Sequence, residues 1–159
     1  MHLSTGRSGS RWLDHDELGV LRVFLNAGVR FVIVGGRAVQ FHGHPRVTKD
    51  LDLLIEASPE NGRHLRSALK ILGTQVTNPE QFESLSEAQR AKGSFCRYAV
   101  DYLTAINSVR FVEAWDDAIR VVADGLTVRV ISKRHLVASK QNTGRSIDES
   151  DAVALNAVQ

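Results

Sequence analysis

Cysteine is almost missing from this sequence, since Cys96 is the only one among 159 residues. An intrachain disulfide and a zinc site built from several cysteines are therefore excluded. Long apolar runs are missing too, because none approaches the roughly 20 residues that a membrane-spanning helix needs. The amino terminus also lacks the apolar core of a signal peptide. We therefore expect a soluble, cytoplasmic protein that does not contact membranes.

Two common nucleotide-binding signatures are absent as well. The glycine turn after the first apolar run, within residues 35–40, does not contain the G-x-G-x-x-G fingerprint of dinucleotide-binding proteins. The pattern of P-loop proteins, G-x-x-x-x-G-K followed by Ser or Thr, does not occur either. These two classes of nucleotide-binding protein are therefore excluded.

A strong charge imbalance is lacking too. The net charge of +2 and the isoelectric point near 8.9 permit an RNA or nucleotide partner without requiring one. A hydrophobic share of 43% and a charged share of 24% are typical of globular proteins. This length corresponds to one domain with a sizeable core. Because the start of the chain is rich in Ser and Gly, we expect residues 1–10 to be disordered and residues 11–159 to form a single domain.

The apolar pattern predicts helices that alternate with short strands. Leucines at helical spacing end before Gly28, Ser58-Pro59 is a strong helix start, and Asp124-Gly125 is a strong hairpin turn. The polar segment 79–90 predicts either a helix or an ordered loop. The predicted helices cover residues 14–26, 35–41, 58–72, 111–119, 132–140 and 147–158, and the predicted strands cover 31–34, 50–56, 95–103, 121–122 and 127–131.

Two aspartates open the predicted strand over residues 50–56. Asp50 and Asp52 are two residues apart, so their carboxylates project from one face about 7 Å apart along the backbone. Neighbouring like charges favour a cation between them, and Mg²⁺ binds carboxylate oxygens while sharing its other positions with phosphates. Gly35-Gly36 opens a predicted helix, whose amino terminus can face an anion. The segment therefore predicts a divalent-metal site beside a phosphate-facing turn.

A third aspartate, Asp101, lies in the apolar strand predicted over residues 95–103. A carboxylate in such a segment needs a cation or hydrogen-bond partner. Two interpretations follow: Asp101 either joins the metal site or pairs with a nearby cation such as Arg97. The D-x-D pair alone is weak evidence, because acidic pairs are common on exposed strand edges.

The combination of these motifs resembles the DNA polymerase β-type nucleotidyltransferase superfamily. It is most similar to the minimal nucleotidyltransferases and the abortive-infection-type nucleotidyltransferase toxins, over roughly residues 14–158. The resemblance implies an α/β (α+β) fold, a mixed β-sheet flanked by helices that is similar to the polymerase β palm. Two departures are a Gly-Gly turn where many members have Gly-Ser, and a short chain without an additional acceptor-holding domain. The motifs are Gly35-Gly36, then Arg46-x-Thr48-x-Asp50-Leu51-Asp52, then Val100-Asp101-Tyr102-Leu103.

The activity that the resemblance implies is transfer of a nucleoside monophosphate from an NTP, such as ATP, to a hydroxyl acceptor. Asp50, Asp52 and Asp101 would hold two Mg²⁺ ions, with Mn²⁺ as an alternative. Asp101 could also take the acceptor proton, although metal coordination alone could activate that hydroxyl. The acceptor could be RNA such as a tRNA end, a protein, or a small molecule such as an antibiotic. A toxin–antitoxin role with a cognate toxin or antitoxin, and a homo-oligomer, are further possibilities.

The nucleotide would bind through the residues around the glycine turn. The amides of Gly35 and Gly36 would face the β- and γ-phosphates. Arg46 and Lys49 border the site and could neutralise phosphate charge. Thr48 could either bond a phosphate oxygen or cap the turn.

A second group lies near the carboxyl terminus. Similar chains carry a lysine on such a helix that reaches toward the nucleotide, so Lys140 is either a triphosphate ligand or a surface lysine. We interpret Arg145 with Asp148 as an ion pair at a helix start. His42 and His44 lie in the loop before the D-x-D motif, and we interpret them as structural or solvated.

Two other functions are alternatives to nucleotidyl transfer. Metal-dependent glycosyltransferases also use D-x-D, but they usually need a longer chain. A non-catalytic member that binds a partner in a toxin–antitoxin pair is the main alternative. The complete set of three aspartates argues against such a degenerate site, and Mg²⁺-dependent stabilisation by NTPs would distinguish the two.

Overall fold

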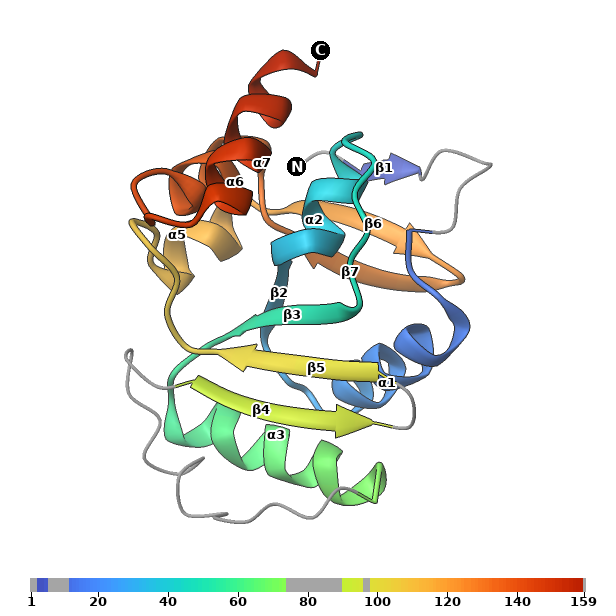
Figure 1. Cartoon of the computed structure of the whole chain (residues 1–159). Helices are drawn as coiled ribbons and strands as arrows, with labels where there is room; N and C mark the ends of the chain where they lie inside the picture. The colour runs from blue at the N-terminus through green and yellow to red at the C-terminus, as the bar shows by residue number, and fades with distance from the viewer. Residues whose placement is uncertain (1–2, 6–11, 74–89, 96–97, 159) are drawn as a thin grey trace.

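The computed structural model describes residues 3–5, 12–73, 90–95 and 98–158. Within these ranges the strands form one mixed seven-stranded sheet in the order β1-β6-β7-β2-β3-β5-β4 (Figure 1). The strands are β1 (Leu3–Thr5), β2 (Phe31–Val34), β3 (Asp50–Ile55), β4 (Arg90–Phe95), β5 (Tyr98–Leu103), β6 (Ile119–Ala123) and β7 (Leu126–Val130). The helices are α1 (His15–Asn26), α2 (Gly35–Phe41), α3 (Pro59–Ile71), α5 (Phe111–Asp116), α6 (Lys133–Lys140) and α7 (Ser146–Ala157).

The central strands β2 and β3 are antiparallel, and β5 lies parallel to β3 on its other side. All four residues of β2 are buried, as expected for an apolar strand that is covered on both faces. On α1, Phe24 stacks on Tyr102 of β5, with ring centroids 5.8 Å apart. Because Tyr102 and Asp101 are successive residues of a strand, α1 covers the sheet face opposite to the one from which Asp101 projects.

Local sequence signals account for the helix boundaries. A capping box between Asp14 and Glu17 starts α1, and the Ser58 hydroxyl accepts a hydrogen bond from the backbone of Asn61 at the start of α3. Ser132 caps α6 in the same way. Figure 1 shows α6 and α7 together near α2, away from α1 and α3. The predicted fold class, a mixed sheet flanked by helices, is confirmed.

The structure differs from the sequence-based prediction at three places. Residues 95–103 form not one strand but the end of β4 and all of β5, which pair antiparallel. The sequence of β4 is polar, and a strand at a sheet edge needs no apolar run, so the pattern does not indicate it. Helix α5 ends at Asp116, and Ile119 already belongs to β6.

The third difference concerns the range 1–10, which we expected to be disordered. Leu3–Thr5 form β1, which pairs parallel with β6. The rest of that range and the segment 79–89 lie outside the described residues. Among the helices that are described, none combines the length and apolar character needed to cross a membrane.

Candidate active site

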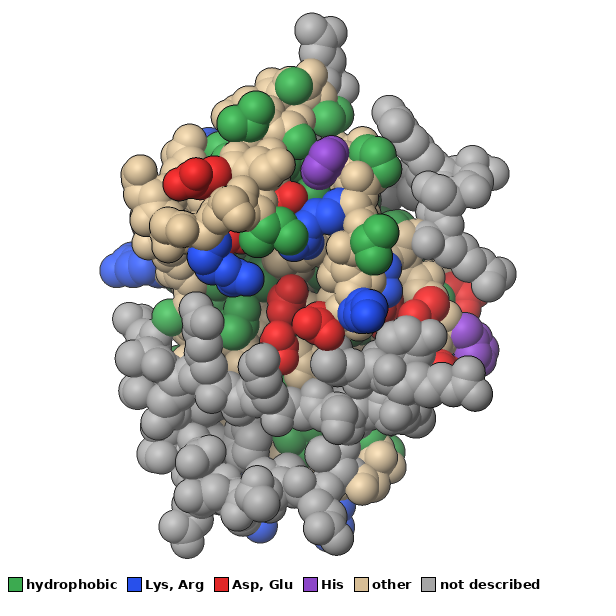
Figure 2. Space-filling view, in the orientation of Figure 1, with side chains coloured by type: hydrophobic (Ala, Val, Ile, Leu, Met, Phe, Trp, Pro, Cys, Tyr) green, Lys and Arg blue, Asp and Glu red, His purple; other side chains and the backbone are tan. Residues whose placement is uncertain are grey.

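A pocket of about 590 Å³ opens beside the central strands, between the β2–α2 turn and the α6–α7 connection. We call it the carboxylate pocket. Figure 2 shows acidic side chains gathered next to lysine and arginine side chains near the middle of this face. The exposed Lys49 does not line the pocket. The other predicted site residues do line it: Gly35, Gly36, Arg46, Thr48, Asp50, Asp52, Asp101 and Lys140.

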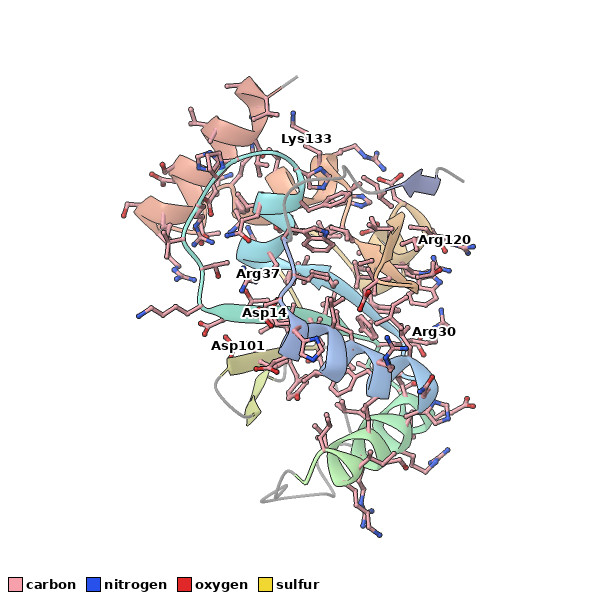
Figure 3. All side chains as sticks on the ribbon, turned by 90° about the vertical axis from the view of Figure 1, so that its right-hand side faces the viewer. Asp14, Arg30, Arg37, Asp101, Arg120 and Lys133 are labelled. Atoms are coloured by element: carbon pink, nitrogen blue, oxygen red, sulfur yellow. The ribbon has the colours of Figure 1, made fainter. Side chains whose placement is uncertain are left out.

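The three aspartates reach one wall because of the strand register. Asp52 on β3 is paired with Asp101 on β5, and with Val34 of β2 on its other side. Residues paired across neighbouring strands project from the same face, so these two carboxylates lie side by side. Asp50 lies two residues earlier on that face. Figure 3 labels Asp101 on β5, next to β3. We call Asp50, Asp52 and Asp101 the carboxylate cluster.

The carboxylate cluster is short of positive charge. Burial, the charge of Asp101 and a hydrogen bond with Asp101 raise the pKa of Asp52 to about 7. The charge of Asp50 contributes to this rise in the pKa of Asp52, and the charge of Lys140 opposes it. At neutral pH the Asp52 carboxyl group therefore retains a proton for part of the time, and a bound cation would replace that proton.

The donor set suits a hard divalent cation, because carboxylate oxygens are the ligands that Mg²⁺ prefers. Within the described ranges, however, no three His, Cys, Asp or Glu side chains are already arranged as a metal-binding group. The raised pKa of Asp52 is the observation that favours a cation here. The residues that would hold it are those of the carboxylate cluster.

The glycine turn contacts both the carboxylate cluster and the loop that precedes β3. Gly35 has a φ of +65°, and an added Cβ there would lie only 2.7 Å from Cγ of Asp52. A Cβ on the buried Gly36 would lie 2.6 Å from the Thr48 hydroxyl and would also collide with Arg46. Both glycines are therefore required by the close approach of site residues. The Thr48 hydroxyl also donates a hydrogen bond to the Asp50 carbonyl at 3.3 Å, which supports its turn-capping role.

A network of buried ion pairs forms the opposite wall. Lys140 Nζ lies 3.2 Å from Asp148 Oδ1 and 3.1 Å from Asp151 Oδ2. Arg46 Nε lies 3.3 Å from Asp151 Oδ1. We call these four residues the ion-pair network. Lys140 is therefore a buried, paired lysine, which rules out the surface interpretation.

No sequence motif singles out Asp151. Its only signal is the spacing from Asp148, because residues three apart lie on one side of a helix. The predicted pair at the start of α7 is present: Arg145 lies at the N-cap position, with Nε 3.8 Å from Asp148 Oδ2.

His42 Nε2 lies 2.8 Å from the Ile131 carbonyl, and burial lowers the pKa of His42. Neither His42 nor His44 lines the carboxylate pocket.

A second ion pair holds the helix that follows the glycine turn. The sequence did not reveal this pair. Arg37 of α2 contacts Glu17 of α1, with Nη2 2.6 Å and Nε 2.9 Å from Oε1. Burial raises the pKa of Glu17, while Arg37 opposes that change. Figure 3 shows Arg37 above the start of α1, which Asp14 marks. This pair fixes α2, and with it the glycine turn, against α1.

A protein-family model described as "Nucleotidyl transferase of unknown function (DUF2204)" matches residues 15–158. No curated protein sequence matches the chain significantly.

Among solved structures, the chain is similar to a lincosamide antibiotic adenylyltransferase, LnuA, solved with lincomycin bound. The two are 16% identical with a TM-score of 0.61, over 92% of this chain and 99% of that one. It is also similar to the antibiotic-resistance factor ANT(2'')-Ia, at 15% identity and a TM-score of 0.58, over 90% and 84% of the two chains. An antigenic nucleotidyltransferase-like protein from Paracoccidioides brasiliensis is 21% identical, with a TM-score of 0.50, over 90% and 77%. These structures share the fold of this chain.

Proposed function

Because the chain belongs to the DUF2204 nucleotidyltransferase family, we propose that it moves a nucleoside monophosphate from an NTP to a hydroxyl acceptor and releases pyrophosphate. The observation that carries this proposal is the pairing of Asp52 with Asp101, on one face of the sheet, beside the glycine turn. The raised pKa of Asp52 supports it, since a nucleotidyltransferase needs bound cations where these carboxylates gather.

In this proposal the carboxylate cluster would hold two divalent ions, Mg²⁺ or Mn²⁺. Bound ions of this kind stabilise the negative charge that develops on phosphate oxygens, and they make an attacking hydroxyl more acidic. Asp101 would take the proton of the acceptor hydroxyl, because it comes from the strand on the far side of Asp52 from the glycine turn.

The remaining residues would bind and orient the triphosphate. Gly35 and Gly36 leave room for a phosphate to approach the backbone. Lys140 and Arg46 carry positive charge on the pocket wall, and the aspartates of α7 hold both in place. A triphosphate would share these cations with Asp148 and Asp151. We leave the exposed Lys49 outside this set.

The test is transfer of label from each of the four α-³²P-labelled NTPs in the presence of Mg²⁺. The acceptor panel contains tRNA, lincomycin and tobramycin. Lincomycin is bound in the similar LnuA structure, and a crystal structure of the similar ANT(2'')-Ia contains adenylyl-2''-tobramycin. A toxin–antitoxin role would require label on RNA or protein, so total cell protein is added to the panel. We expect labelled acceptor and released pyrophosphate in equal amounts.

The control pair is Asp52→Asn against Asp16→Asn, because Asp16 is exposed on α1 and does not line the pocket. Only the first variant should lose transfer. If no NTP stabilises the wild-type protein in the presence of Mg²⁺, the catalytic proposal is wrong, and a partner-binding role would be favoured instead.

A further inference from the structure

A second pocket, of about 460 Å³, adjoins the carboxylate pocket. Ile106 lines both pockets, so they share a wall. The second pocket lies between the ends of β3 and β5 and the start of α5, with Glu56, Thr104 and Phe111 among its lining residues. Its volume falls in the range of about 300–1,000 Å³ that is usual for small-molecule sites. None of its lining residues belongs to the carboxylate cluster or to the proposed nucleotide-binding residues.

The two pockets follow one another along the same pair of strands. Val34 is paired with Asp52 in an antiparallel ladder, so the glycine turn that follows Val34 lies toward the start of β3. Glu56 directly follows the other end of β3. Glu56 lies four positions after Asp52 along the extended chain, which corresponds to about 13 Å. In Figure 3, Asp101 and Arg30, which pairs with Glu56, lie far apart on the two sides of the view.

This order matters for the proposed reaction, on which the present inference rests. In phosphoryl transfer the attacking and leaving oxygens lie on opposite sides of the phosphorus. If the glycine turn receives the pyrophosphate, the acceptor hydroxyl must approach from the opposite direction. The second pocket opens on that side of the carboxylate cluster.

We propose that the second pocket holds the body of the acceptor, a small hydroxylated molecule with an apolar ring and no net charge. Its hydroxyl oxygen bonds to the α-phosphorus while the bond from that phosphorus to the bridging oxygen breaks. Pyrophosphate leaves with the bonding electrons, and the hydroxyl proton passes to Asp101.

The charge of the second pocket supports a neutral ligand. Glu56 and Arg110 are opposite in sign and line the same cavity. Two contacts fix the Glu56 carboxylate. Its Oε2 lies 3.1 Å from Arg30 Nε, and its Oε1 accepts a hydrogen bond from the Ser58 hydroxyl at 3.2 Å. A fixed carboxylate of this kind accepts hydrogen bonds from hydroxyl groups and repels phosphates.

The apolar part of the second pocket suits a ring. Ile106, Val109 and Phe111 line it, and Phe111 is itself stacked on Trp115 with centroids 5.7 Å apart and planes 29° apart. Such a supported aromatic wall favours a flat apolar body over a flexible charged one. Asn107 donates a hydrogen bond to the Gln141 carbonyl at 2.9 Å. This bond ties the loop that divides the two pockets to the chain after α6.

Methyl NMR tests the proposal without knowledge of the natural acceptor. Three probes are added separately to protein labelled at valine and isoleucine methyl groups: Mg²⁺ with α,β-methylene-ATP, phenyl β-D-glucopyranoside, and tRNA. We expect the nucleotide analogue to shift Val34 and not Val109 or Val112, because only Val34 lines the carboxylate pocket. The glucoside should shift Val109 and Val112 in a saturable manner.

Two alanine substitutions provide the matched control. Ala105→Trp fills the second pocket and should weaken glucoside binding at least about tenfold while leaving nucleotide binding unchanged. Ala157→Trp, at an exposed alanine that lines neither pocket, should change neither binding event.

Four outcomes would contradict the inference or the function on which it rests, in distinguishable ways. Shifts of Val109 and Val112 by the nucleotide analogue would assign the second pocket to the nucleoside. A response of these valines to tRNA, but not to the glucoside, would assign it to a polymer acceptor. A response of Val34 without any glucoside response would overturn the acceptor pocket alone, whereas loss of the Val34 response would overturn nucleotidyl transfer itself.

Discussion

The carboxylate cluster and the ion-pair network face one another across one pocket. The carboxylates of the network are paired with cations, whereas those of the cluster are not balanced in this way. The cluster concentrates three carboxylates, and burial together with Asp101 raises the pKa of Asp52 to about 7. In the network, burial alone would raise the pKa of Asp148, but Lys140 and neighbouring groups lower it below the usual range. One wall is short of positive charge, and the other supplies its own.

This difference distinguishes carboxylates whose charge favours binding of a cation from residues that already form ion pairs with one another. A buried charge without a partner is costly, so it marks a place where a bound ion would be favourable. The side chains of Lys140 and Asp151 are only 10% and 3% exposed, and each already has an opposite charge within 3.3 Å. We therefore expect substitutions in the cluster to affect activity most, and substitutions of the two aspartates in the network, Asp148 and Asp151, to affect stability most.

Asp52→Asn is the strongest test of the cluster. It should lower nucleotidyl transfer by roughly 10⁴-fold, because it removes a metal-binding charge at nearly constant volume. The melting temperature without metal should stay equal or rise, since repulsion with Asp101 is relieved. Transfer and thermal melting are measured on one preparation, beside Asp16→Asn. Undiminished transfer at saturating Mg²⁺ would show that the cluster does not bind the catalytic ions.

Asp151→Asn is the corresponding test of the network. It leaves Lys140 and Arg46 without a shared carboxylate in a buried place, and breaking such a pair costs about 3–5 kcal/mol. Urea unfolding measures the loss, and the exposed neighbour Glu149→Gln should change stability by less than about 0.5 kcal/mol. A loss below about 1 kcal/mol for Asp151→Asn would mean that the network does not hold α7 in place.

The sequence predicted the cluster better than the network for a physical reason. Apolar runs and turn residues are local signals, so the segments at 31–34 and 35–41 were predicted with the boundaries of β2 and α2. The D-x-D motif is also local, and Asp101 stands out as a carboxylate in an apolar segment, which the resemblance to known nucleotidyltransferases assigns to the same site. The pairing of Asp52 with Asp101 joins segments about fifty residues apart and depends on the order of strands.

The network and the Glu17–Arg37 pair could not be predicted because their members come from distant elements and carry no local signature. Asp151 reads as one more polar residue on an amphipathic helix until α7 is packed against α6. Edge strand β4 was missed because its polar sequence resembles a loop. Only the folded arrangement shows which of these charges are buried.

Gly35→Ala tests how closely the turn approaches the cluster. Its φ of +65° makes any side chain strained, and a Cβ would also collide with Asp52. Gly73→Ala is a matched control, because Gly73 has a φ of +72° with nothing within 4 Å of the added Cβ. We expect a loss of about 1–2 kcal/mol for Gly73→Ala from strain alone, and about 1–3 kcal/mol more for Gly35→Ala from the collision. Equal losses in urea unfolding would show that Asp52 moves aside without cost.

The carboxylate cluster should also make the free energy of unfolding depend on pH, with a smaller effect than the substitutions above. The folded state raises the pKa of Asp52 from near 4 to about 7, so between these values the folded protein holds a proton that the unfolded chain has released. Stability contributed by Asp52 should therefore fall as pH rises through this window, by on the order of 1–3 kcal/mol. The measurement is urea unfolding from pH 5 to 8 in excess chelator, as the difference between the wild type and Asp52→Asn. A difference that is flat, or that rises with pH, would contradict the raised pKa.

Arg145→Gln should have the smallest effect and marks the edge of the ion-pair network. Its side chain is 71% exposed and its Nε lies 3.8 Å from Asp148, whereas Lys140 holds the same carboxylate from inside the protein. Exposed pairs of this kind contribute about 0–1 kcal/mol and weaken further in salt. We therefore expect a loss below about 0.5 kcal/mol, which 0.5 M NaCl should remove, while the loss in Asp151→Asn should persist in the same salt. A loss in Arg145→Gln as large as that in Asp151→Asn would extend the network to the surface, and the distinction between its buried and exposed members would then fail.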